Sequence, residues 1–297
     1  MENEALIEIK NGEKSFVSTR GISRKKVVTK ALNGINLSIF KGETLGVVGE
    51  SGSGKTTLGR SIVGLEPLTS GEIYYEGQLV TTRTRQAVGK DMQIIFQDPY
   101  SALNPTRTAL ESVMEPLLLK VNRNEARRIA LEMLAVVGLD ETAANKLPRA
   151  FSGGQRQRIG IARAIATHPT FVLCDEPTSA LDVSIQRQVL DLLIELQKKL
   201  NLTYLFISHD LSVVRFISDR IAVMYKGHLV ELGPAKAVFE TPAHAYTKQL
   251  LKAAPLTDPV EARQQMANNN SASEEIHLSD HFDWVAIDTD HFVRKCK

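Results

Sequence analysis

The chain has 297 residues, of which 43% are apolar and 24% charged, and its 36 basic and 34 acidic residues leave a formal charge of +2. This is the composition of an ordinary globular protein, and it excludes a disordered chain, a collagen-like fibre and a disulfide-rich scaffold. The near balance of charge gives no reason to expect nucleic acid as a partner. The length predicts roughly two domains or lobes.

The sequence predicts neither a signal peptide nor a transmembrane helix. The first residues carry several glutamates and no apolar core, and no run of about 18 uncharged apolar residues occurs in the chain. The only cysteines are Cys174 and Cys296, which is typical of a chain from a reducing compartment. We therefore expect a soluble protein of the cell interior.

The first part of the chain shows the patterns of β-strands. Apolar and polar residues alternate at residues 6–9 and again at residues 31–40. After a turn at Gly42, residues 44–48 are almost wholly apolar, as in a strand that is buried on both faces. The inward-facing residues predicted for the second strand are Leu32, Ile35, Leu37 and Ile39.

A run of basic residues without any acidic residue separates the first two predicted strands. We interpret this run as a solvated loop, and a patch that contacts phosphate or lipid is the alternative. The run comprises Arg20, Arg24, Lys25, Lys26 and Lys30.

A mainly helical insertion within the α/β lobe is predicted at about residues 101–168. Inside it, residues 123–137 place their apolar side chains on one face at helical spacing, and Gly138 follows as a stop signal. The buried-strand pattern returns at residues 171–174 and 205–207. The chain is therefore expected to return to the α/β core after the insertion.

The composition changes again near the end of the chain. Pro234 and Pro242 mark the end of the core, and the residues after Pro259 are richer in acidic and other polar side chains. We predict one main domain over residues 1–257. Residues 258–297 are predicted to form a linker and a small appendage of marginal stability.

Residues 49–56 read GESGSGKT and fit the phosphate-binding pattern G-x-x-x-x-G-K-[ST]. The glycines let successive backbone N–H groups point at phosphate oxygens. Lys55 supplies a positive charge to the β- and γ-phosphates, and the hydroxyl of Thr56 can ligate Mg²⁺. The pattern follows a buried strand and opens a predicted helix over residues 55–65, whose N-terminal end also attracts anions. These residues therefore predict a nucleotide site.

Two adjacent carboxylates, Asp175 and Glu176, follow the predicted strand at residues 171–174. In a P-loop ATPase an acid at this place holds Mg²⁺ or its water, and Asp175 is that candidate. Glu176 would lie near the γ-phosphate, where it could polarise the attacking water. A solvated strand end is the alternative. Cys174 is interpreted as a small buried apolar residue.

Ser152, Gly153, Gly154 and Gln155 precede a segment of apolar residues at helical spacing. By themselves they predict a turn before a helix that Ser152 caps. The start of a helix with two glycines is also a second anion-binding end. One phosphate-binding loop needs only one anion-binding helix end, so the second could bind the nucleotide of a partner chain.

Together these patterns resemble the ATP-binding-cassette (ABC) family, and the resemblance extends over roughly residues 4–255. It looks closest to the ATP-binding subunits of oligopeptide and dipeptide importers. Residues 243–247, AHAYT, are similar to the His-Pro-Tyr-Thr region of these subunits, with Ala245 in place of the usual proline. The segments that carry the resemblance are 49–55 (GESGSGK), 95–99 (IFQDP), 103–105 (LNP), 151–158 (FSGGQRQR), 174–177 (CDEP), 179–186 (SALDVSIQ) and 208–210 (SHD).

The resemblance implies an α/β P-loop ATPase core with an antiparallel β subdomain, an inserted helical subdomain and a short C-terminal appendage. It also implies roles for single residues. Phe16 would stack on adenine, with a plain core aromatic as the alternative reading. Gln97 would reach Mg²⁺ and the attacking water, Asp182 would lie at the dimer seam, and His209 would contact the γ-phosphate and Glu176.

The expected site therefore has three groups of residues. The catalytic group is Glu176, His209 and Gln97. The magnesium group is Thr56, Gln97 and Asp175. The nucleotide-binding group is Phe16, Gly49, Ser51, Gly52, Ser53, Gly54, Lys55, Thr56, Thr57 and Gln97, with Ser152, Gly153, Gly154, Gln155 and Asp182 acting on the nucleotide of the opposite subunit.

The function implied by the resemblance is ATP hydrolysis, with Mg²⁺ as cofactor, in a membrane importer for peptides. Expected partners are two transmembrane permeases, a second ABC ATPase or a second copy in a head-to-tail dimer, and an extracytoplasmic solute-binding protein. The expected location is the cytoplasmic face of the cell membrane. An importer of nickel or another solute, an exporter, and a soluble ABC ATPase acting on ribosomes or DNA are the alternatives.

The sequence departs from the subfamily pattern at two places. Relatives often carry a cysteine-rich C-terminal stretch suited to an iron–sulfur cluster, whereas this chain has only Cys296 there, so we predict no cluster in the monomer. Arg149 and Ala150 stand before Phe151, where relatives usually have an acidic residue. This second difference concerns a contact with a partner chain and leaves the catalytic residues in place.

Overall fold

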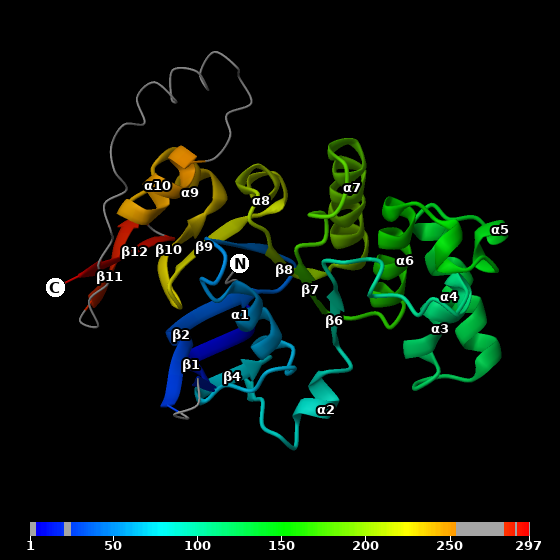
Figure 1. The fold of residues 1–297 in the computed structure, drawn as a ribbon, viewed down its shortest axis with the longest axis horizontal. Helices are drawn as coiled ribbons and strands as arrows, with labels where there is room; N and C mark the ends of the chain where they lie inside the picture. Colours follow the sequence, from blue (N-terminus) through cyan, green and yellow to red (C-terminus); the bar gives the residue numbers. More distant parts are fainter. Residues whose placement is uncertain (1–3, 21–24, 254–281, 289, 297) are drawn as a thin grey trace, which may run out of the picture.

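The computed structural model describes residues 4–20, 25–253, 282–288 and 290–296, and these residues form a mixed α/β fold (Figure 1). A four-stranded sheet has the order β2-β1-β4-β5, and an eight-stranded sheet has the order β11-β12-β10-β9-β3-β8-β7-β6. The strands are β1 Ala5–Arg20, β2 Lys25–Phe40, β3 Thr44–Val48, β4 Ser70–Tyr75, β5 Gln78–Leu79, β6 Met92–Ile95, β7 Phe171–Asp175, β8 Thr203–Ile207, β9 Arg220–Tyr225, β10 His228–Pro234, β11 Phe282–Asp288 and β12 His291–Cys296.

The helices follow the predicted distribution along the chain, and most of the central ones lie in the insertion. They are α1 Lys55–Ile62, α2 Arg85–Val88, α3 Ala109–Leu117, α4 Arg123–Val136, α5 Glu141–Ala144, the 3₁₀ helix η1 Pro148–Ala150, α6 Gly153–Ile165, α7 Val183–Leu200, α8 Leu211–Ile217, α9 Ala235–Glu240 and α10 Ala245–Ala253. Among the described residues, none of these helices is both long and apolar enough to cross a membrane.

The centre of the larger sheet is parallel, and its strands are buried on both faces as predicted. Strand β3 pairs in parallel with β8 and β9, and β7 pairs in parallel with β6 and β8. Alternate residues of these strands belong to two different clusters. Phe171 and Leu173 face α1 and the smaller sheet, whereas Val172 and Cys174 face α6, α7 and α8. The sheet is therefore the middle layer of three.

Gly46 lets α8 approach the sheet closely. A side chain at this position of β3 would bring its Cβ within 2.4 Å of atoms of Val214 and Ser218. Only a residue without Cβ fits there without moving the helix, so Gly46 sets the distance between α8 and β3.

Helices occupy most of the segment predicted as a helical insertion, and the bounds of that subdomain stay a prediction. Strand β6 leads into helices α3 to α6, which lie together at one side of the molecule (Figure 1). Helix α4 starts at an Asn122 cap and ends before Gly138, whose φ of 78° is the left-handed conformation typical of a helix stop.

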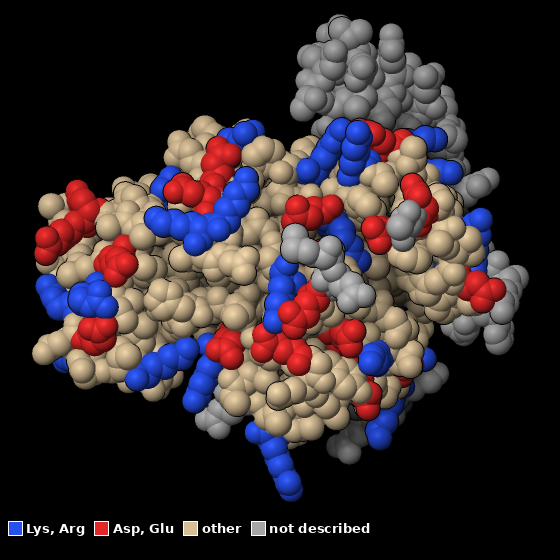
Figure 2. Space-filling view, turned by 180° about the vertical axis from the view of Figure 1, so that it is seen from behind, with Lys and Arg blue, Asp and Glu red and all other residues tan. Residues whose placement is uncertain are grey.

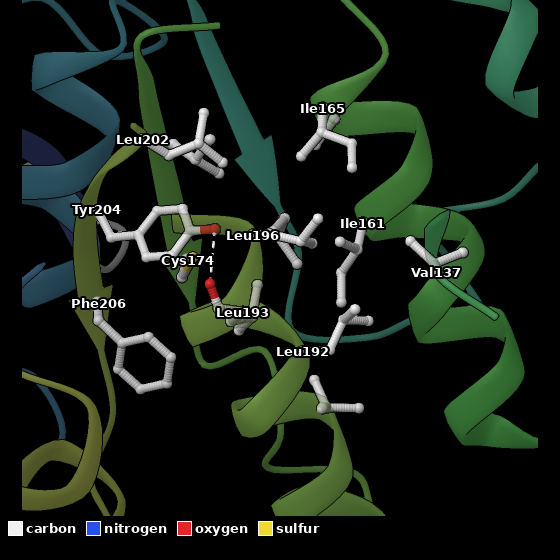
Figure 3. Close-up of a cluster of buried hydrophobic side chains, with 14 of the residues drawn as sticks. Val137, Ile161, Ile165, Cys174, Leu192, Leu193, Leu196, Leu202, Tyr204 and Phe206 are labelled. Atoms are coloured by element: carbon white, nitrogen blue, oxygen red, sulfur yellow. Dashed lines mark hydrogen bonds between the residues drawn. The ribbon is translucent and has the colours of Figure 1, made fainter. Parts of the chain in front are cut away.

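Helix α6 joins the insertion to the sheet. Figure 3 shows Ile161 and Ile165 of α6 opposite Leu192 and Leu196 of α7, with Tyr204, Phe206 and Cys174 of the sheet beside them. Tyr204 donates a hydrogen bond from its hydroxyl to the carbonyl of Leu193 at 3.2 Å. Cys174 is fully buried, and this burial raises the pKa of its thiol, so the interpretation as an apolar core residue is confirmed.

The interpretation of the basic run as a loop is wrong for most of its residues. Strands β1 and β2 form a long antiparallel hairpin in which Arg20 pairs with Lys25 and Val17 with Val28. Lys26 and Lys30 are therefore strand residues, while Arg24 lies outside the described residues. Charge pattern alone failed here because the partner strand, not the local sequence, satisfies the backbone hydrogen bonds.

The described part of the predicted C-terminal appendage consists of two strands. Strands β11 and β12 form a hairpin, and β12 pairs with β10 of the main sheet at Leu232–Phe292. His291, Val293 and Arg294 are nearly fully buried against that sheet. Residues 258–281 of the predicted linker and appendage lie outside the described residues, and the domain boundary stays a prediction. From the sequence alone, a strand rich in polar and charged residues is expected to be only marginally stable, because the residues that bury it are distant in the chain.

Charged side chains are interspersed over the surface. Figure 2 shows Lys and Arg next to Asp and Glu over most of the visible face, without a broad area of one sign. This distribution agrees with the nearly balanced composition.

Candidate nucleotide site

Nine of the predicted site residues lie at the carboxyl ends of the parallel strands β3, β6, β7 and β8. In an open α/β sheet this edge is where ligands bind, because loops and helix N-termini converge there. A cleft of about 590 Å³ lies at this edge. Nine predicted residues line it, namely Ser51, Gly52, Gly54, Lys55, Thr56, Thr57, Gln97, Glu176 and His209. A larger hollow of about 780 Å³, bordered by β1, β2 and β12, contains none of the predicted residues.

The loop at residues 49–54 depends on glycine for its shape. Gly49, Gly52 and Gly54 have φ values of 150°, 80° and 106°, and a Cβ on Gly54 would lie only 2.3 Å from the carbonyl oxygen of Ala31. Around Gly52 nothing lies within 4 Å of such a Cβ. Gly54 is the N-cap of α1 and supplies no side chain to the first N–H groups of the helix. The loop and helix therefore present backbone donors to the cleft.

Lys55 is held by the loop that it follows. Its Nζ donates to the carbonyl oxygens of Gly49 and Glu50 at 2.7 and 2.8 Å. Burial lowers the pKa of Lys55, an effect that the charges of Glu176 and Asp175 oppose. A partly desolvated ammonium of this kind favours an anionic ligand.

The residues beside Lys55 fit a magnesium nucleotide. Thr56 Oγ1 donates to Asp175 Oδ1 at 3.1 Å, and burial raises the pKa of Asp175. A hydroxyl and one carboxylate are the usual protein ligands of Mg²⁺ beside phosphates. Ser53 Oγ is buried and has no hydrogen-bond partner among the described residues. The site therefore has hydrogen-bonding capacity that the chain itself does not use.

Three predicted catalytic residues converge on one oxygen atom. Gln97 Nε2 donates to Glu176 Oε2 at 3.1 Å, and His209 Nδ1 lies 3.2 Å from the same oxygen. Glu176 has a φ of 50°, an uncommon conformation for a residue other than glycine. Its N–H donates to the carbonyl of Ile207 in the adjacent strand β8, and Ser179 donates to its carbonyl. Backbone contacts thus hold Glu176 at the strand end with its side chain directed to Gln97 and His209.

The second predicted anion-binding end lies apart from this cleft. Ser152 caps α6: Gln155 N donates to Ser152 Oγ at 3.3 Å, and Ser152 N donates to Gln155 Oε1 at 3.0 Å. A Cβ on Gly154 would lie 2.4 Å from Ile185 of α7, so this glycine packs closely. None of the predicted residues 152–155 is among the residues of this chain that line the cleft. Their action on a nucleotide stays a prediction.

Five other predicted residues are also absent from the lining of the cleft as the described chain forms it: Gly49, Ser53 and Asp175, which adjoin residues of the lining, and Asp182 and Phe16. Asp182 is the N-cap of α7, where its side chain makes no capping hydrogen bond. Phe16 lies in β1, is 43% exposed, and has Lys14 Nζ 5.1 Å from its ring centroid. Its exposure argues against a plain core aromatic, while stacking on adenine stays a prediction.

Sequence reasoning missed one contact with the phosphate-binding loop. The N–H of Glu50 donates to the hydroxyl of Tyr246, which lies in α10 at the other end of the chain. The only signal was the similarity of residues 243–247 to a subfamily motif, and that similarity carried no information about the loop.

Known proteins resemble this chain in sequence over nearly its whole length. The profile of the family described as "ABC transporter" matches residues 32–179, and that described as "Oligopeptide/dipeptide transporter, C-terminal region" matches residues 230–279. The oligopeptide transport ATP-binding protein OppF of Bacillus subtilis (strain 168) is 47% identical, with 98% of this chain and 96% of that protein covered. OppF of Streptococcus pyogenes serotype M1 is 45% identical, with 98% and 95% covered.

Solved structures share the fold as well. The dimeric ATP-binding cassette MJ0796, in a post-hydrolysis state bound to ADP and Pi, matches with a TM-score of 0.67 and 33% identity and covers 77% of this chain and 98% of that chain. CbiO1 from Clostridium perfringens, part of the ABC transporter complex cbiONQ, matches with a TM-score of 0.71 and 25% identity, with 89% and 99% covered.

Proposed function

The chain belongs to the ABC transporter family of ATP-binding proteins, and we propose that it hydrolyses ATP to drive an importer of oligopeptides or dipeptides. One observation of the site carries the proposal: Glu176 meets Gln97 and His209 beside the phosphate-binding loop. The match of residues 230–279 to the C-terminal region of oligopeptide and dipeptide transporters supports the choice of cargo.

In this proposal the phosphate-binding loop and Lys55 bind the triphosphate of ATP. Thr56 and Asp175, which are joined by a hydrogen bond of 3.1 Å, would hold Mg²⁺ together with Gln97. When bound, Mg²⁺ neutralises the charge on the β- and γ-phosphates. Lys55 Nζ has three N–H groups, of which two donate to the carbonyl oxygens of Gly49 and Glu50, so the third is available to a phosphate oxygen.

Glu176 polarises the attacking water in this proposal. Gln97 and His209 orient its carboxylate, because both contact the same oxygen, Oε2. The second oxygen of Glu176 is then available to accept a hydrogen bond from water. His209 is 63% exposed at its side chain, so it can also reach the γ-phosphate.

A dimer completes the site. Residues 152–155 present a capped helix N-terminus away from this chain's own cleft, so in a head-to-tail dimer they close on the nucleotide of the opposite subunit. Asp182 lies at the seam in the same arrangement. The similarity to the dimeric cassette MJ0796 supports this pairing. The second subunit is either another copy of the chain or a different ABC ATPase.

The remaining partners and the location belong to the same proposal, which the similarity to oligopeptide transport ATP-binding proteins supports. Two separate permease subunits provide the path across the membrane, and a solute-binding protein on the outside delivers the cargo. The chain then lies at the cytoplasmic face of the cell membrane.

Uptake of a labelled tripeptide tests this function. Cells that lack the chain should take up little peptide, the wild-type chain should restore uptake, and Glu176→Gln should not. A tagged chain purified from detergent-solubilised membranes should bring down two polytopic permeases and a second cassette ATPase. Restored uptake of nickel but not of peptide would contradict the cargo. Recovery of ribosomal proteins without a permease would contradict transport.

A further inference from the structure

The hydroxyl of Tyr246 contacts the phosphate-binding loop from the far end of the chain. Glu50 N donates to Tyr246 Oη at 2.9 Å across 196 residues of sequence. Tyr246 lies in the first turn of α10 and is 2% exposed. Burial raises the pKa of Tyr246 to about 12, so its hydroxyl is neutral at physiological pH. The contact is therefore a hydrogen bond between neutral groups that solvent does not reach freely.

This hydrogen bond and the contact of Lys55 hold one and the same peptide unit. The unit between Gly49 and Glu50 donates its N–H to Tyr246, and its carbonyl oxygen, that of Gly49, accepts from Lys55 Nζ at 2.7 Å. Two partners on opposite ends of a planar peptide fix its orientation. Tyr246 therefore determines the direction of the carbonyl that holds the phosphate-binding lysine.

The ring of Tyr246 has little freedom to move away. It packs against Tyr225 with ring centroids 4.3 Å apart and an angle of 34° between the ring planes. Tyr225 ends β9, which pairs with β3, the strand that leads into the phosphate-binding loop. The ring and the loop therefore rest on neighbouring strands of one sheet.

Buried polar contacts hold the start of α10. Ala243 N and His244 N donate to the two carboxylate oxygens of Glu231 at 2.8 and 2.9 Å, and Tyr246 N donates to His244 Nδ1 at 3.1 Å. His291 of β12 lies 2.7 Å from Glu231 through its Nε2. The C-terminal hairpin thus helps to place the segment that carries Tyr246.

We propose that Tyr246 is a positioning residue for nucleotide binding, which acts by holding the Gly49–Glu50 peptide in the orientation that the bound nucleotide requires. A loop that is ordered before the ligand arrives loses less conformational freedom on binding, which favours affinity. Loss of the hydroxyl should weaken ATP binding without removing any group that touches ATP.

Tyr246→Phe in the full-length chain tests the proposal, with Tyr225→Phe as the matched control. Both variants lose one hydroxyl from the same pair of rings, but only Tyr246 bonds to the loop. In Tyr246→Phe, the Kd for Mg-ATP and the KM should rise about two- to tenfold, the worth of one ordinary hydrogen bond. The kcat should stay within about twofold. In Tyr225→Phe, both constants should match the wild type.

Hydrogen exchange distinguishes positioning from a general structural role. The amide of Glu50 should lose protection in Tyr246→Phe, whereas amides of α10 and the melting temperature should stay close to the wild type. An unchanged Kd, or an equal rise in Tyr225→Phe, would overturn the proposal. If Tyr246→Phe did not fold, hydrogen exchange of the Glu50 amide in the wild-type protein would test the proposal. An unprotected Glu50 amide would exclude its hydrogen bond to Tyr246 and overturn the proposal.

Discussion

Two polar clusters on the same sheet differ in how deeply they are buried. In the nucleotide cleft, His209 is 63% exposed and Ser53 Oγ has no partner among the described residues. In the second group, which we name the C-terminal cluster, His228, Glu231, His291 and Arg294 are all buried. Glu231 accepts two backbone N–H groups and contacts His291, while Arg294 contacts His228 and lies over the ring of Phe282.

The difference follows from the role of each cluster, which is ligand binding in the cleft and structural support in the C-terminal cluster. A buried polar group without a hydrogen bond costs stability, so the members of a buried structural cluster are held mainly by contacts with one another and with the backbone. A cluster that awaits a ligand keeps donors and acceptors unpaired. Substitutions in the cleft should therefore affect turnover more than folding, and substitutions in the C-terminal cluster should do the reverse.

Glu176→Gln should give the largest effect. The amide keeps the size and polarity of the side chain but cannot accept a proton, so kcat should fall by about 10²–10⁴. Binding of Mg-ATP and the melting temperature should stay close to the wild type. Steady-state ATPase assays and equilibrium nucleotide binding measure this. Glu195→Gln on the exposed side of α7 is the control, and a kcat near the wild-type value in Glu176→Gln would refute the role.

Glu231→Ala should give the largest loss of stability. It removes the acceptor of two buried backbone N–H groups and the partner of His291, which should lower the free energy of unfolding by about 3 kcal/mol. Urea denaturation measures this loss. The exposed Glu240→Ala should change stability by less than about 0.5 kcal/mol. Equal stability of the two variants would contradict the structural role assigned to the C-terminal cluster.

Ser152→Ala should have a mixed effect. Loss of the cap that accepts from Gln155 N should cost about 1 kcal/mol of stability. If residues 152–155 also close on a partner's nucleotide, turnover should fall as well. Ser152→Asn, which can cap the helix, should restore stability but not turnover. Recovery of both by Ser152→Asn would show that the residue acts as a helix cap alone.

Asp175→Asn should change stability the least. Unlike the other variants, it should make the protein slightly more stable. Burial raises the pKa of Asp175, so the folded state binds its proton more tightly than the unfolded state. The stability of the nucleotide-free protein therefore falls as pH rises through that pKa. The asparagine variant has no group that ionises there, so its stability does not fall in this way. At pH 7 its Tm should exceed the wild type by about 2 °C, and the difference should shrink below about pH 4.

The same variant should lose the dependence of nucleotide affinity on Mg²⁺. Melting curves between pH 4 and pH 7, with and without Mg-ATP, check both parts. A variant less stable than the wild type at pH 7 would show that Asp175 is a stabilising group.

Much of the nucleotide site was predictable because its determinants are local. A buried apolar strand followed by glycines, Lys55 and Thr56 specifies the loop and the helix start within a few residues. Asp175 and Glu176 were predictable as site residues because two carboxylates directly follow another buried apolar strand. His209 and Gln97 needed the family resemblance, since a lone histidine or glutamine after a strand has no chemical signature of its own.

The C-terminal cluster and Tyr246 were not predictable in the same way. Glu231, His291 and residues 243–244 are far apart in the chain, and each looks like a polar surface residue in its own segment. Their burial depends on β12 pairing with β10. The long β1–β2 hairpin was missed for a related reason, because its basic residues favour a loop until the partner strand is known.

Local sequence patterns predict the α/β core, the helical insertion and the chemistry of the phosphate-binding loop, because strand burial, helical spacing and glycine conformation are encoded by neighbouring residues. The three-dimensional fold was needed to show that Gln97 and His209 contact the same oxygen of Glu176, that Tyr246 bonds to the Gly49–Glu50 peptide, and that β12 pairs with the main sheet. These contacts join residues that only sheet pairing and helix packing bring together.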